Sequence, residues 1–320
     1  MPRDKTIFVA IPSYRDAELP LTVARLIAAA SRPANLRFGI CQQDKLSDWV
    51  DFSQFQGKIS IDLYNCLPEE SHGLCWALNK CYGMYGGEDY FLQLDAHSEM
   101  IEDWDTILIK QDQQCSDIFG GTKNIFSSYP AGYTIDKQLN RTLLPLGAAS
   151  KTLLHYEEGR PFPTGHAITL DDPDRPVKAR YLSGGFMFGA GQFCTEVPYN
   201  PEIVFWGTEI ITTVRAYTAG FDLFHPSQPV GWHHYGERHI ARKGRPHVWN
   251  LYDDEKRAVK FEERNRKSFD LVEQLLNGTY QGPFGLGSAR TLAQFECYAG
   301  IDLKSRSRTP EAESGDYADS

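Results

Sequence analysis

Two residues with metal-binding chemistry, Asp95 and His97, follow directly after an apolar run, Tyr90–Leu94. The run predicts a short buried strand, and ligands of open α/β sheets bind where such strands end. A carboxylate and an imidazole two residues apart can hold one side of a divalent cation, and mixed oxygen and nitrogen ligands suit manganese better than calcium. The competing interpretation is a turn capped by Asp95, with His97 as a surface residue.

A further ligand could come from a distant segment. His233 and His234 stand between two aromatic residues in WHHY (232–235). Either imidazole could complete the metal site. Alternatively, both are partly buried histidines packed against aromatic rings.

Two other segments carry charged groups that suit a sugar-nucleotide. Glu209 ends FWGTE (205–209), just before an apolar stretch with helical spacing, and could contact sugar or acceptor hydroxyls. It could equally be an acid favoured near a helix start by the helix dipole. The basic run 238–245, which contains Arg242 and Gly244, could close over a diphosphate. A solvated charge cluster is the alternative.

The elements that must position these residues alternate between strand-like and helix-like patterns. The first third predicts strands at 6–11, 37–41, 59–64 and 90–94 and helices at 19–30 and 73–84. This alternation predicts a mostly parallel sheet covered on both faces. Residues 120–200 predict loops and short strands, including 183–189, and helices are expected at 208–220 and 251–277.

Composition excludes several classes. The chain has 320 residues and a net charge of −9, which argues against nucleic acid and anionic membranes as principal partners. No secretion signal and no apolar run of about 18 residues is visible, so we expect a cytoplasmic protein without a membrane span. The seven cysteines contain no CxxC pair and predict free thiols. No P-loop, GxGxxG or GxSxG motif is present.

Eight segments, in one order, resemble the cytoplasmic UDP-GlcNAc-dependent protein-hydroxyproline N-acetylglucosaminyltransferases and their bacterial relatives. More distantly they resemble the mucin-type polypeptide GalNAc transferases. The segments are IPSYRDAEL (11–19), RPANLRFGICQQD (32–44), FLQLDAHSEMIEDWD (91–105), SSYPAGY (127–133), SGGFMFGAGQFCTEVPYNP (183–201), FWGTEI (205–210), WHHY (232–235) and FGLGSARTLAQFECYAGID (284–302).

The resemblance implies a GT-A fold, a Rossmann-like α/β architecture. It also implies a retaining, metal-dependent transfer of a sugar, GlcNAc foremost, from a UDP-sugar to a protein or peptide hydroxyl. Asp95, His97 and His233 match the metal ligands, with His234 as the alternative to His233. Manganese is the expected ion and magnesium the alternative. Retention without an evident nucleophile suggests front-face attack, in which the departing phosphate oxygen accepts the acceptor's proton.

The resemblance also implies roles for other residues. Asp95, Trp206 and Glu209 are the candidate catalytic residues. The candidate sugar-nucleotide contacts are Pro12, Ser13, Tyr14, Arg15, Asp16, Gln43, Asp44, Gly184, Gly185 and Arg242. This chain departs from the family pattern at Thr208, where the family has an acid, and at Leu78, where it has an arginine. A sugar-nucleotide-binding pseudoenzyme and a transferase acting on a glycan are therefore the alternatives.

The chain is expected to divide into four parts. Residues 1–110 are expected to form a nucleotide-sugar-binding half, and residues 111–250 an acceptor-binding and catalytic half. A helical segment is expected at 251–303, followed by a disordered tail at 304–320.

Overall fold

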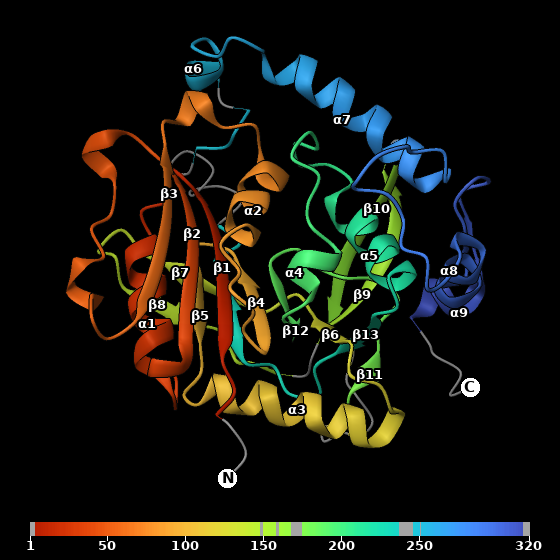
Figure 1. The fold of residues 1–320 in the computed structure, drawn as a ribbon, viewed down its shortest axis with the longest axis horizontal. Helices are drawn as coiled ribbons and strands as arrows, with labels where there is room; N and C mark the ends of the chain where they lie inside the picture. The colour runs from red at the N-terminus through yellow and green to blue at the C-terminus, as the bar shows by residue number, and fades with distance from the viewer. Residues whose placement is uncertain are drawn as a thin grey trace.

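The computed structural model describes residues 4–147, 150–157, 160–167, 175–236, 246–249 and 251–315. Its centre is an eight-stranded sheet with the order β11-β13-β6-β12-β4-β1-β2-β3 (Figure 1). The strands of this sheet are β1 (Ile7–Tyr14), β2 (Leu36–Gln43), β3 (Ser60–Cys66), β4 (Tyr90–Leu94), β6 (Asn124–Ser127), β11 (Val177–Lys178), β12 (Phe186–Ala190) and β13 (Asp222–His225).

The first four strands of the chain form a parallel part of this sheet. β3, β2, β1 and β4 run parallel to one another. β12 then enters antiparallel between β4 and β6. The predicted α/β architecture is confirmed, with a mixed sheet in its second part. Every residue of β1 except the last is buried, as expected for a central strand covered on both faces.

Helices cover both faces of this sheet. In the described part of the chain, the helices are α1 (Leu19–Ala29), α2 (Leu74–Tyr82), α3 (Trp104–Phe119), α4 (Phe193–Glu196), α5 (Thr208–Thr218), α6 (Leu251–Asp254), α7 (Phe261–Leu276), α8 (Leu292–Ala299) and α9 (Pro310–Ser314). Short 3₁₀ turns occur at Pro33–Asn35, Leu46–Asp48, Ser53–Phe55 and Pro68–Glu70. Apolar residues of α1 and α3 form one core with Ile7, Val9 and Ile11 of β1. α2, α5, α7 and α8 contribute to a second core, with Phe8 and Ala10 on the opposite face of the same strand.

A second, four-stranded sheet lies beside the end of β4. It contains β5 (Ser98–Met100), β14 (Gly231–His233), β7 (Ala131–Ile135) and β8 (Arg141–Leu143), in that order. β14 pairs antiparallel with β5, which places His233 opposite Ser98. The chain thus returns from a distant segment to the residues that follow β4.

The residue before α5 is Gly207, and two features of the structure require a glycine there. Gly207 has φ +83°, a conformation that L side chains rarely adopt. A Cβ at this position would also lie 2.8 Å from side-chain atoms of Val272 in α7. Gly220, expected from sequence to end this helix, has φ +91° just beyond it.

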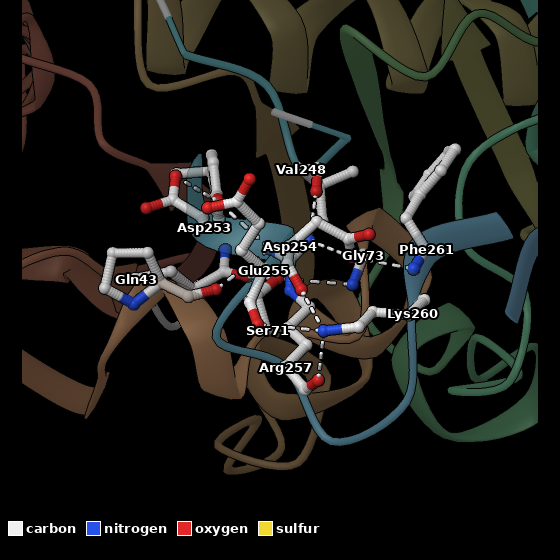
Figure 2. Close-up of polar contacts among 12 residues, drawn as sticks. Gln43, Ser71, Gly73, Val248, Asp253, Asp254, Glu255, Arg257, Lys260 and Phe261 are labelled. Carbon is white, nitrogen blue, oxygen red and sulfur yellow. Dashed lines mark hydrogen bonds and ion pairs between the residues drawn. The ribbon is translucent and has the colours of Figure 1, made fainter. Parts of the chain in front are cut away.

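Two predictions for the C-terminal region are wrong. The helix expected at 251–277 is broken into α6 and α7, because Lys260 Nζ caps the carbonyl oxygens of Asp254, Glu255 and Arg257 at 2.9–3.0 Å (Figure 2). Part of the tail expected to be disordered is structured. β16 (Ser307–Arg308) pairs with β15 (Ile301–Asp302), and α9 follows. Residues 316–320 lie outside the described part of the chain.

The remaining elements complete the molecule. β9 (Ser150–Glu157) and β10 (Arg160–Ala167) form an antiparallel hairpin. The boundary expected at residue 110 falls inside α3, and the central sheet takes strands from both expected halves. All seven cysteines are free, as predicted. Among the described residues, none of the helices has the length and apolar character needed to span a membrane.

Candidate functional site

Three side chains with metal-binding chemistry meet at the carboxyl end of β4. Asp95 follows β4, His97 precedes β5 and His233 ends β14. Nε2 of His233 lies 2.9 Å from Oδ2 of Asp95, and Nε2 of His97 lies 3.9 Å from the same oxygen. One candidate ligand atom from each residue lies within 4.8 Å of the others. Neighbouring ligands of a cation bonded at about 2.1 Å are roughly 3 Å apart, so one divalent ion fits this donor set after small adjustments.

Asp16 fixes the orientation of His97. Nδ1 of His97 lies 2.7 Å from Oδ2 of Asp16. An ionised carboxylate only accepts hydrogen bonds, so Nδ1 carries the proton and Nε2 keeps its lone pair toward Asp95. Such a carboxylate–imidazole pair is the usual support of a metal-binding histidine. Asp16, predicted to contact the sugar-nucleotide, is therefore also a partner of the metal-ligand candidate.

His234 does not join this cluster. Its ring stacks on Tyr133, with centroids 5.1 Å apart, and its main-chain N–H donates to the carbonyl oxygen of His97. Successive side chains of an extended chain face opposite sides, so only one of the two histidines can point at Asp95. The structure brings His233, and not His234, to the candidate metal site.

The cluster lies in the wall of a cavity of about 430 Å³. A cavity of this size suits a small-molecule ligand. The predicted site residues that line it are Pro12, Tyr14, Asp16, Gln43, Asp95, His97, Gly184, Gly185, Trp206, Glu209 and His233. Ser13, Arg15 and Asp44 do not line it, and Arg242 lies outside the described residues.

Arg15, Ser13 and Asp44 have other partners. Nη1 of Arg15 donates to Oδ2 of Asp253 at 2.7 Å. The carbonyl oxygen of Ser13 accepts a hydrogen bond from Nε2 of Gln43 at 3.0 Å. Asp44 accepts from the N–H of Lys45. Their expected contacts with a sugar-nucleotide therefore remain predictions.

The C-terminal segment is attached to the edge of the cavity through Tyr14. The Tyr14 hydroxyl donates to Oδ2 of Asp253 and accepts from Nη2 of Arg257, both at 3.0 Å. Burial raises the pKa of the Tyr14 hydroxyl, with opposite contributions from Arg257 and Asp253. Asp253 and Arg257 lie beside Gln43 and Ser71 in Figure 2. Asp253 and Arg257 do not line the cavity themselves. They hold the side chain of Tyr14, which does line it.

Gln43 is held rigidly at the end of β2. In addition to its bond to Ser13, its Oε1 accepts from the Ser71 hydroxyl at 2.6 Å. The Ser71 hydroxyl in turn accepts from the N–H of Gly73 at 3.2 Å (Figure 2). A side chain with its amide fixed at both ends can present one defined face to a ligand.

Glu209 is a buried acid of the site with a strongly shifted pKa. Oε1 accepts from the N–H of Gly184 at 2.7 Å, and the Tyr129 hydroxyl donates to the carboxylate at 3.2 Å from each oxygen. The pKa of Glu209 is raised to about 7, chiefly by burial and also by the charge of Asp95, while these hydrogen bonds act in the opposite direction. Glu209 can therefore exchange a proton near neutral pH.

Gly184 and Gly185 provide space between the two acids. A Cβ on Gly185 would lie 3.2 Å from Oδ2 of Asp95, and a Cβ on Gly184 would lie 3.6 Å from Cγ of Glu209. Neither glycine has a positive φ. Gly185 is thus required sterically, because an added methyl group would crowd Asp95, whereas at Gly184 the added contact would be an ordinary van der Waals contact.

Aromatic rings also line the cavity. Trp206 packs edge-on against Phe205, and Trp249 does the same from the segment after residue 245. His247 stacks on Trp249 with centroids 4.5 Å apart. These rings give the cavity an apolar wall suited to contacts with a sugar or a peptide.

Comparison with known sequences now identifies the family. The model of the glycosyltransferase (GlcNAc) family matches residues 6–58 and 49–305, which is most of the chain. The chain belongs to this GlcNAc glycosyltransferase family. Comparison of this family member with curated proteins gives no match.

Solved structures show which fold the GlcNAc glycosyltransferase shares. A structure of GalNAc-T7 with UDP, GalNAc and Mn²⁺ is similar with a TM-score of 0.59 and 14% identity, over 92% of this chain and 54% of that one. The likeness shows the GT-A fold, and this chain spans about half the length of GalNAc-T7. Two further matches have lower TM-scores. A Pyrobaculum calidifontis mannosyltransferase with GDP-Man and Mn²⁺ has 0.48 (10% identity, 76% and 60% of the two chains). S. aureus TarS 1–349 with UDP-GlcNAc also has 0.48 (8% identity, 84% and 72%).

The sequence analysis assigned no role to several residues of the candidate site of this GlcNAc glycosyltransferase. Tyr129 lies in a Gly-, Pro- and Tyr-rich stretch without periodicity, yet it holds Glu209. Asp253 and Arg257 looked like ordinary charges of an amphipathic helix. The contact of Arg15 with Asp253 spans 238 residues, so only the fold could reveal it.

The raised pKa of Glu209 predicts a pH-dependent stability. Between about pH 4.5, the ordinary value, and about pH 7, the folded protein binds a proton that the unfolded chain releases. The free energy of unfolding should therefore fall as pH rises through this window, by about 3 kcal/mol from this group. Glu209→Gln cannot ionise and should lack this component.

The measurement is urea unfolding of both proteins across this pH range, with a chelator present throughout. Groups distant from Glu209 titrate in both proteins alike, so the difference between them reports Glu209 together with its effect on Asp95. At pH 8 the Gln variant should be the more stable protein. A difference that stays constant with pH would show that the carboxyl group ionises normally.

Proposed function

We propose that this protein is a metal-dependent, retaining transferase that moves GlcNAc from UDP-GlcNAc to a hydroxyl group of a protein or peptide acceptor. The observation that carries the proposal is the meeting of Asp95, His97 and His233 in the wall of a cavity that also contains Glu209. Family membership supports the sugar, and the Mn²⁺ and UDP in the GalNAc-T7 structure support the ion and the nucleotide. The sequence resemblance supports the acceptor class.

The donor set fits a divalent cation. It combines one carboxylate with two imidazoles, and His97 already has its other nitrogen held by Asp16. Asp95 and Glu209 also raise each other's cost of ionisation, which a nearby positive charge would relieve. Mn²⁺ is the proposed ion; when bound, it neutralises the charge that develops on the leaving diphosphate.

The chain's own residues supply position and proton control. Gln43 and Tyr14 would contact the nucleotide, and Trp206 adds an apolar face to the same cavity. Glu209, fixed by Gly184 and Tyr129, orients sugar and acceptor hydroxyls by accepting their hydrogen bonds. Its carboxylate keeps lone pairs for these hydroxyls beside the bonds from Gly184 and Tyr129, and we assign it no covalent role.

Loss of a ligand should abolish transfer. Asp95→Asn and His97→Gln should each lower metal-dependent UDP release at least about 100-fold, since a lost charge-stabilising contact costs about 3 kcal/mol. Asp16→Asn keeps the ligand but weakens its support, and should lower Mn²⁺ affinity by about tenfold or more. UDP release is measured over a panel of UDP-sugars, with and without peptide acceptors and with excess chelator as control.

The outcomes of that assay separate the alternatives. Release from UDP-GlcNAc that persists in excess chelator would contradict the metal role. Sugar-nucleotide binding without any release would identify a pseudoenzyme. Stimulation only by oligosaccharides would identify a glycan acceptor.

Tyr129→Phe tests the support of Glu209. The substitution removes a hydrogen-bond donor to the carboxylate and keeps the ring. The pKa of Glu209 should rise, and kcat should fall about tenfold with little change in the KM for UDP-GlcNAc. The measurement is kcat and KM as functions of pH. An unchanged pH profile with reduced stability would show that Tyr129 only packs.

Gly185→Ala tests the steric argument. The added methyl group would push on Oδ2 of Asp95, and Mn²⁺ affinity should fall by about tenfold, or 1.4 kcal/mol. Gly83→Ala is the matched control, because that glycine has an ordinary φ and its nearest contacts would be 3.4 Å away. Calorimetric titration with Mn²⁺ decides; equal affinities in the two variants would contradict the argument.

A further inference from the structure

α2 separates two cavities. Its residues Leu74, Ala77 and Leu78 line the 430 Å³ cavity described above. Trp76 and Lys80, on another side of the same helix, line a second cavity of about 570 Å³. The helix turns by about 100° per residue, which places these two sets on different faces.

The second cavity is built from three parts of the chain. Its walls include His72, Trp76 and Lys80 from the α2 region, Glu202 from the turn before α5, and Arg264 from α7. The rings of His72 and Trp76 lie 5.2 Å apart. Nζ of Lys80 lies 5.4 Å from the centre of the Trp76 ring. Aromatic surface and positive charge thus adjoin each other.

The local charge is positive although the whole chain carries −9. Lys267 forms an ion pair with Glu202, which neutralises that acid. Lys80 and Arg264 form no ion pair with the residues that the structure describes. The other acid of the wall, Glu263, is exposed and forms no ion pair with the residues that the structure describes. Two cations therefore face one acid.

Arg264 is held in a costly environment. Its Nε is buried and makes no hydrogen bond within the described part of the chain. Burial lowers the pKa of the guanidinium, and the positive charge of Arg257 adds to this, while the charges of Glu263 and Asp254 act in the opposite direction. The pKa of His72 is also lowered, first by burial and then by the positive charges of Arg264, Lys80 and Arg257. A buried, unsatisfied donor with like charges beside it is destabilising unless an acceptor is supplied.

We propose that this second cavity binds a small anionic ligand, whose phosphate or carboxylate group pairs with Arg264 and Lys80 and whose body lies against Trp76. Guanidinium and ammonium groups are the usual partners of such anions, and Arg264 offers the planar donor set that suits them. The volume suits a metabolite rather than a single ion. This site is independent of the proposed transfer reaction, because none of its walls carries a ligand or an acid of the first cavity.

The test uses three probes of similar size, namely glucose 6-phosphate, glucuronate and glucose. Each is titrated calorimetrically into the protein with UDP and Mn²⁺ present, so that the first cavity is not the binding site. One or both anions should bind saturably and glucose should not, which also tells phosphate from carboxylate. Binding should weaken by about tenfold in Arg264→Gln and in Lys80→Gln.

Arg266→Gln is the matched control. It removes the same charge from α7, but Arg266 is exposed and does not line the cavity. The indole N–H signal of Trp76 in an NMR spectrum, assigned with Trp76→Phe, should shift with the anion in wild type and in the control. No saturable binding of either anion, or equal loss in Arg264→Gln and Arg266→Gln, would overturn the proposal. If Arg264→Gln fails to fold, Lys80→Gln decides alone.

Discussion

The contact between His233 and Asp95 joins two parts of the chain that are 138 residues apart, and the site is arranged around it. Its geometry depends on the small sheet. β5 begins directly after His97 and pairs with β14, so the register that sets His233 opposite Ser98 also sets its distance from Asp95. β7 supports β14 from the other side. Ligand atoms placed by strand pairing are held more precisely than ligand atoms placed by loops.

The same region concentrates groups that reduce stability. Glu209 is buried close to Asp95 and is stabilised as a carboxylate by hydrogen bonds from Gly184, Tyr129 and Ser183. Gly185 keeps open a space that any other residue would fill. Each feature costs free energy in the folded protein and is compensated by the two large cores on either side of β1. Conflict between local stability and site geometry is what a functional site is expected to show.

Local patterns predicted the elements that carry the site, and tertiary pairing could not be predicted. The strand before Asp95 and the helix whose first turn carries Glu209 followed from apolar runs and a terminal glycine. α3 did not, because its sixteen residues mix apolar side chains with several polar ones. The break between α6 and α7 depends on Lys260, a residue with good helix propensity whose capping contacts become visible only in the folded chain.

The candidate site shows the same division. Asp95, His97 and Glu209 could be proposed from their place after a strand or before a helix. The choice between His233 and His234 needed the register of β14, and the support by Asp16 and Tyr129 needed the fold. Arg15 matched the family pattern, but the structure pairs it with Asp253, a residue that no short-range pattern connects to it.

α2 links the family departure at Leu78 to the second cavity. Where the family carries an arginine, this chain places a buried leucine in the wall of the first cavity, so the helix offers no cation there. Two residues on, at about 200° around the helix, Lys80 lines the second cavity instead. The positive charge of this helix therefore faces away from the proposed sugar-nucleotide site. In the first cavity, the charge of a bound diphosphate must then be met by groups other than α2, which makes the Asp95, His97 and His233 cluster more important to binding.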